Sequence, residues 1–227
     1  QVAQWFTRHH GERMGALVFG VDQAWCHSQA LTFQSNPFPD WLYAPSALDY
    51  LRGLMQTSSF EAADKKIAVM LGKGEAARAD GFDDYEANRT WSLSEMRRIA
   101  KTQAPSLAPA VARTAPRDMP AAGALARFVD ALPAPTVVVA VFPPVHASVL
   151  PAPETEAGAA LAACKQAVAA VAADRPGRLA VVDYLHDGEL AGAEENFWDG
   201  THYRSNVARL IEADIATAIR RLRAGGV

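Results

Sequence analysis

An aspartate and a histidine near the end of the chain are the residues best suited to chemistry. The segment 196–203 reads Asn-Phe-Trp-Asp-Gly-Thr-His-Tyr, so that Asp199 and His202 fall on one short turn. A carboxylate in that position can accept from the imidazole Nδ1–H, fix the tautomer and stabilise the imidazolium. Nε2 then stays free to take a proton from a nucleophile. We predict that His202 and Asp199 are catalytic. The alternative is that Asp199 caps the loop and His202 is a polar residue at a helix start.

Four further residues are candidates for substrate binding. Trp198 and Tyr203 flank the pair and could shield it from water. Asp22 and His146 follow two other predicted strands, and sites in open parallel sheets form at the carboxyl ends of strands. His146 could donate to the substrate or to an oxyanion. Alternatively, His146 is a turn histidine bonded to the backbone, and Asp22 caps a loop.

The elements that must position these residues follow from apolar patterning. Short apolar or β-branched runs predict strands over 16–21, 136–142 and 178–184. Stretches with a helical repeat separate or follow them, at 121–132, 154–173 and 205–223. Alternating strands and helices with long crossovers indicate an α/β fold with a mainly parallel sheet covered on both faces.

The rest of the chain is less regular. We predict helices over 2–10, 46–56 (capped by Ser46), 58–71 (capped by Ser58 or Ser59) and 92–102 (starting at Ser92 or Ser94). Prolines and glycines make 23–45 and 72–90 loops. We expect a single domain over 1–227, with 72–118 as a loop-rich insertion. Three strands are few for such a sheet, so we expect upstream strands to lie outside this sequence.

Composition excludes several function classes. The formal net charge is −3, and no lysine or arginine run stands out beyond Arg220-Arg221 with Arg223 in a helix tail, so we expect no nucleic-acid partner. No apolar run approaches the roughly 20 residues that span a bilayer. Asp22, His146, Asp199 and His202 could converge on a metal, but no spacing typical of metal ligands supports this, so we expect neither metal nor cofactor. Cys26 and Cys164 could pair or stay free, and the helical pattern around Cys164 favours a buried free thiol. The sequence does not indicate an oligomeric state.

The order of strand, long loop, Phe-Trp-Asp-Gly-Thr-His-Tyr and final helix resembles the C-terminal block of the SGNH (GDSL-like) hydrolase superfamily. It is most similar to the membrane-anchored bacterial branch related to polysaccharide O-acetyltransferase subunits. The resemblance implies a three-layer α/β/α, flavodoxin-like sheet and a Ser-His-Asp mechanism. It also implies an esterase or O-acyltransferase that acts on an acylated cell-envelope glycan, in the periplasm or cell envelope. A membrane would be involved only through an N-terminal anchor outside this sequence.

The position expected for the nucleophilic serine does not match the family pattern. The resemblance would place a serine in the turn after the first strand, but the similar turn at 20–23 ends in Gln23. Either the nucleophile strand lies upstream of Gln1, or the serine has been lost. We favour the first explanation, because residues 1–13 read as a crossover helix that leads into a strand. Ser28 and Ser35 lack the context of a nucleophile turn. The alternative function is a non-catalytic binding or assembly module with an SGNH-like fold.

Overall fold

The computed structural model describes residues 2–26, 39–44, 46–73, 78, 84, 86–87, 89–107 and 119–225. The chain divides into two compact units. One comprises residues 1–9 and 34–89, and the other comprises residues 10–33 and 90–227. We describe each unit by itself. The expectation of one domain over 1–227 stays a prediction.

The smaller unit is helical. It contains most of α1 (Val2–His10), a 3₁₀ turn (Asp40–Tyr43), α2 (Ala47–Leu54) and α3 (Thr57–Met70). The predicted cap of α2 is confirmed, since the Ser46 hydroxyl accepts from the Asp49 N–H. The predicted cap of α3 is wrong. This helix begins after Gln56, and Ser59 instead donates its hydroxyl to the Gly53 carbonyl.

A parallel sheet organises the larger unit. Its strands are β1 (Ala16–Gly20), β2 (Val137–Phe142) and β3 (Leu179–Asp183), in the order β1-β2-β3. Register pairs Val18 with Val139, and Val139 with Ala180. Every residue of β2 is buried, as expected for a central strand of β-branched residues covered on both faces. The predicted α/β class is therefore confirmed.

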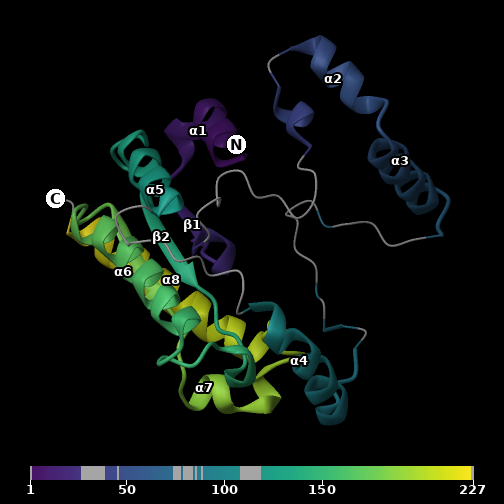
Figure 1. The fold of residues 1–227 in the computed structure, drawn as a ribbon. Coiled ribbons are helices and arrows are strands. Elements are labelled where there is room, and N and C mark those ends of the chain that lie inside the picture. The colour runs from purple at the N-terminus through teal and green to yellow at the C-terminus, as the bar shows by residue number, and fades with distance from the viewer. Residues whose placement is uncertain are drawn as a thin grey trace. The chain divides into compact units, whose positions relative to one another are not determined.

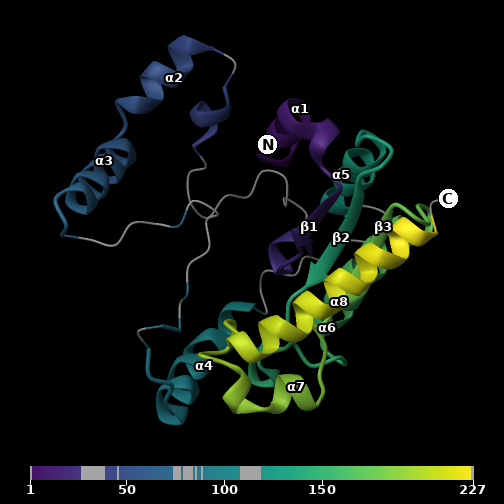
Figure 2. The ribbon, with the colours of Figure 1, turned by 180° about the vertical axis from the view of Figure 1, so that it is seen from behind.

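Alternate residues of the strands pack into two separate clusters. One cluster joins Leu17, Ala140 and Val181 to α5 (Pro120–Asp130) and α6 (Glu156–Ala173). The other joins Val139 and Val182 to α8 (Ser205–Ala224). Figures 1 and 2 show α8 and α6 running along the sheet. The period-two alternation thus lets one short strand set supply both clusters.

A disulfide joins Cys26 to Cys164, with 5.4 Å between their Cα atoms. Cys26 closes the 3₁₀ turn after β1 (Gln23–Cys26), and Cys164 lies in the middle of α6. Both residues are buried in the cluster under α6. The expectation of a buried free thiol at Cys164 is therefore wrong. Two cysteines 138 positions apart carry no pattern that would reveal their pairing.

Three helical segments surround the carboxyl end of the sheet. They are α4 (Leu93–Leu107), α7 (Glu189–Gly192) and a 3₁₀ turn (Glu194–Asn196). The Ser92 hydroxyl accepts from the Glu95 N–H, which confirms Ser92 as the start signal of α4. The helix extends further than the predicted end at residue 102. Among the described helices, none combines the length and the apolar character that a bilayer crossing requires.

Candidate active site at the carboxyl end of the sheet

Asp199 builds its own turn. One carboxylate oxygen, Oδ1, accepts from the backbone N–H groups of Thr201 at 2.7 Å and of His202 at 2.9 Å. The other oxygen, Oδ2, lies 2.7 Å from Nδ1 of His202. Aspartate readily closes such turns through its own side chain. Asp199 therefore caps the loop and also holds the imidazole, while the catalytic role of the pair stays a prediction.

The two members of the pair differ in exposure. The Asp199 side chain is 15% exposed, whereas the His202 side chain is 74% exposed. Burial opposes ionisation of Asp199, but hydrogen bonds from the Thr201 N–H and from His202 outweigh it and lower the pKa of this carboxyl. Asp199 is thus a carboxylate at neutral pH, fixed beside an imidazole that solvent can reach. That arrangement suits an orienting acid and a general base.

Backbone hydrogen bonds join the two ends of the segment 197–203, which carries Asp199 and His202. Phe197 and Tyr203 form an antiparallel bridge, and the Trp198 N–H donates to the His202 carbonyl at 2.8 Å. Phe197 is completely buried against Met96 of α4. Burial is the main cause that raises the pKa of Tyr203, with the Glu212 carboxylate adding to it. Tyr203 is therefore an anchoring neutral phenol in this loop.

Two other segments clamp the turn. The Gln103 side-chain oxygen of α4 accepts from the Gly200 N–H at 2.7 Å, and the Gly200 carbonyl accepts from the His146 N–H at 2.9 Å. Gly200 is buried, and a Cβ there would lie 2.6 Å from Val149 Cγ1 and 2.7 Å from the Gln103 oxygen. Only glycine lets the helix and the loop approach this closely without rearrangement. The backbone of the turn is thus held from both sides.

Arg204 braces the loop just after His202. Its guanidinium carbon lies 5.6 Å from the centre of the Trp91 ring and 5.4 Å from that of Trp198, within cation–π range of both. The Trp91 indole N–H also donates to the Phe197 carbonyl at 2.8 Å. Trp198 therefore has a visible structural role. Its predicted contact with substrate stays a prediction.

His146 lies in the loop after β2, four residues beyond Phe142, and contacts the Asp199–His202 turn through its backbone. The residue is 9% exposed, and its ring packs edge-on against Phe197 and places Nδ1 2.8 Å from the Ser148 hydroxyl. The Ser148 N–H also points at Nδ1, at 3.2 Å, which is the turn-histidine arrangement. Burial lowers the pKa of His146, with Glu194 opposing this shift, so the ring is neutral at pH 7. Donation from His146 to a substrate stays a prediction.

A pocket of about 260 Å³ adjoins this histidine. Met96 and Ala100 form its apolar part, and Lys101 and Glu194 contribute charge at its wall. Glu194 is held by Arg97 in a two-point ion pair at 2.7 and 2.8 Å. Because Ala100 also contacts the Gly200 position, the pocket lies next to the turn that carries the pair.

Asp22 occupies the exit of the neighbouring strand. It is exposed, and it follows Val21, which is buried and extends the β1–β2 ladder through a 2.7 Å bond to the Val141 carbonyl. The structure thus joins Asp199 directly to His202 and ties His146 to the same turn through its backbone bond to Gly200. Asp22 lies at the same carboxyl end of the sheet. Ser28 and Ser35 lie outside the described residues.

Sequence reasoning missed Gln103, Gly200 and Ser148 as parts of the site. The glycine two residues before a histidine and the serine two residues after one were visible, but nothing local marks them as contacts. Gln103 acts across 97 sequence positions. Within the described part of the chain, no cluster of three or more histidine, cysteine or acidic side chains could hold a metal ion.

Comparisons of this chain with protein-family models, with curated proteins and with solved structures find no match.

Proposed function

We propose that this chain is an SGNH-like esterase or O-acyltransferase domain in which His202 is the general base and Asp199 its orienting carboxylate. One observation carries the proposal. The Asp199 Oδ2 to His202 Nδ1 distance is 2.7 Å, on a turn that α4 and the loop after β2 hold in place. An exposed imidazole bonded through Nδ1 has Nε2 left for proton transfer.

The proposed reaction is acyl transfer in two steps. A serine hydroxyl attacks the ester carbonyl while His202 takes its proton, and Asp199 stabilises the imidazolium. The imidazolium then protonates the leaving alkoxide as the acyl–enzyme forms. In the second step, His202 takes a proton from water or from an acceptor hydroxyl, which attacks the acyl group. The serine oxygen leaves with the proton returned by His202.

The finer fold assignment belongs to the same proposal. The α5–α6 cluster and the α8 cluster use opposite residues of each strand, which supports a three-layer, flavodoxin-like arrangement. The placement of the Asp–His turn between the last strand and the last helix supports the SGNH reading. In this reading, the serine comes from a segment that is not part of residues 1–227, since the turn after β1 carries Gln23.

We infer the substrate class and location from the resemblance: an O-acylated glycan of the cell envelope, met in the periplasm. One observation is in keeping with that location. A disulfide such as Cys26–Cys164 persists in oxidising compartments and is rare in reducing ones.

Hydrolysis of p-nitrophenyl acetate by the full-length protein tests the proposal. His202→Ala should reduce kcat/KM by at least about a hundredfold, the usual range for a lost general base. His9→Ala provides the control, because His9 stacks on Trp5 in the smaller unit and has no role in the proposed chemistry. Equal kcat/KM values for wild type and His202→Ala would refute the proposal.

The alternative function is a non-catalytic binding or assembly module with the same fold. The observation that favours it is Gln23, at the position where the resemblance would place serine. Labelling with a fluorophosphonate probe separates the two. The enzyme reading expects labelling of the full-length protein but none of residues 1–227 alone. Failure of both to label supports the binding module, and labelling at Ser28 or Ser35 contradicts both readings.

A further inference from the structure

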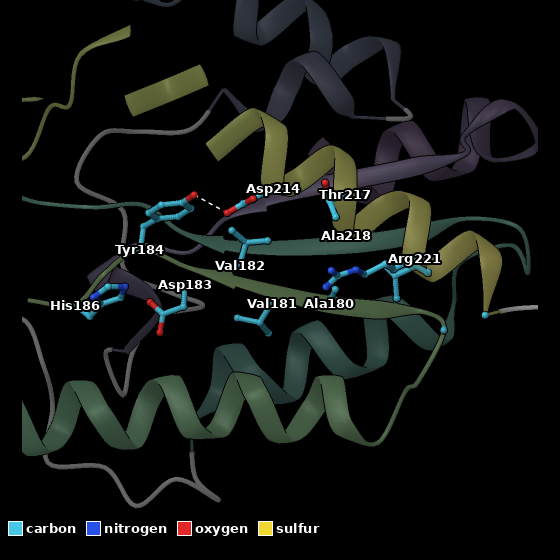
Figure 3. Close-up of a pocket in the computed structure, with 13 residues that line it drawn as sticks. Ala180, Val181, Val182, Asp183, Tyr184, His186, Asp214, Thr217, Ala218 and Arg221 are labelled. Carbon is cyan, nitrogen blue, oxygen red and sulfur yellow. Dashed lines mark hydrogen bonds between the residues drawn. The ribbon is translucent and has the colours of Figure 1, made fainter. Parts of the chain in front are cut away.

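A groove runs along the outer edge of β3, away from the Asp199–His202 pair. Its volume is about 650 Å³, and residues of β3 and of α8 line it. Figure 3 shows the strand on one side and the helix above it. The Tyr184 hydroxyl bonds Asp214 at 2.6 Å at one end, and Gly177 approaches Gly225 at the other. The helix therefore runs antiparallel to the strand.

Among the described residues, no backbone partner is seen for several N–H and C=O groups of β3 on the side of this groove. The Arg178 carbonyl and the Tyr184 N–H both bond to β2, so even-numbered residues between them face β2. Val181 and Asp183 then direct their N–H and C=O groups outward, whereas the Leu179 N–H bonds the Arg175 carbonyl in the turn before the strand. Val181 lies at the centre of the strand. An edge of this kind is a template for another strand.

The groove carries a positive side chain towards one end and a negative side chain towards the other. Arg221 lies beside Ala180, and Asp214 lies beside Tyr184, as Figure 3 shows. A strand added antiparallel from a second copy would bring its Arg221 to Asp214 of the first copy, and the reverse. The edge is thus self-complementary under a twofold axis through Val181, as an isologous interface requires.

We propose that two copies of this chain pair through the outer edges of their β3 strands and form one continuous sheet, to which each copy contributes its three described strands. Val181 of each copy donates its N–H to the carbonyl of Val181 in the other. Two Arg221–Asp214 pairs close the ends of the seam. The inference does not depend on the ester chemistry, because none of these residues belongs to the Asp199–His202 turn.

Sedimentation velocity of the full chain over about 1–200 μM tests the pairing, because weak homodimers dissociate in this range. Wild type should shift from monomer to dimer. Val181→Pro should stay monomeric and folded, since proline is tolerated where an edge N–H faces outward. Val18→Pro is the matched control. The Val137 and Val21 N–H bonds place Val18 among the outward residues of β1, at the opposite edge.

Charge variants give a second, independent readout. Arg221→Glu and Asp214→Lys should each weaken the dimer by about tenfold or more, and an equimolar mixture should restore it because both pairs reform. Arg209→Glu, an exposed change on the same helix outside the groove, should leave it intact. A monomer at every concentration, a dimer kept in Val181→Pro, or a dimer lost in Val18→Pro would each overturn the proposal.

Discussion

Reduction of the Cys26–Cys164 disulfide should cost the larger unit a large part of its stability. The bond closes a loop of 138 positions between the turn after β1 and the middle of α6. In the chain-entropy treatment, a loop of that length confines the unfolded chain by about 5 kcal/mol. For a chain of this size, that corresponds to a fall in Tm of roughly 10–20 °C.

Urea unfolding of oxidised and reduced protein, followed by circular dichroism, measures this difference directly. Because both sulfurs are buried, the native protein should resist reductant and react only in urea, so the reduced sample is prepared unfolded and then refolded. The double variant Cys26→Ala/Cys164→Ala is the control. It should show a low stability that reductant does not change.

Two results would refute the reasoning. One is a difference below about 1 kcal/mol between the unfolding free energies of oxidised and reduced protein. That result would mean that the disulfide does not stabilise the protein by confining the unfolded chain. The other is the presence of two titratable thiols in unfolded, unreduced protein, which would show that the pair does not form.

Three other perturbations test the site. Gly200→Ala should destabilise by about 1–3 kcal/mol, because its Cβ would lie 2.6 Å from Val149 Cγ1, and urea unfolding measures this. Asp199→Asn should lower stability at pH 7 by about 1.5–3 kcal/mol through lost charged hydrogen bonds. Folding lowers the pKa of Asp199, so its contribution to stability is present above the unfolded pKa and disappears as pH falls through the folded value. The stabilities of the two proteins should therefore begin to converge as pH falls below about 4. Arg204→Leu should cost about 1–2 kcal/mol by removing the cation between two indole rings, and an unchanged unfolding midpoint would contradict that role.

The regular elements of the larger unit were predictable because local patterning determines them. The β-branched run at 137–142 could be buried on both faces only as a central strand. The apolar stripe of α8, with Val207 and Ile211 on one side, likewise fixed which face meets the sheet. The predicted start of α3 was wrong because Ser58 and Ser59 both carry the side chain of a typical N-cap, whereas Gln56 occupies the N-cap position.

The candidate site was predictable only in its local part. Asp199 and His202 lie on one turn, so their spacing alone implies the contact. The groups that hold this turn come from far along the chain, as Gln103 and the His146 N–H do. Such contacts depend on how α4 and the loop after β2 pack, and no periodicity or capping rule encodes that. The Cys26–Cys164 pairing was hidden for the same reason.

The parallel arrangement of the sheet gives the larger unit a direction. The loop after β2 carries His146 and the chain after β3 carries the Asp199–His202 turn, so both leave the same end of the sheet. Two copies joined antiparallel along β3 would therefore present these turns at opposite ends, facing away from each other. Such an assembly would be bivalent toward a long polymer. The two turns would bind two distant points of the same polymer chain, and the polymer would gain avidity because it connects those points. A small ester would instead bind each site independently.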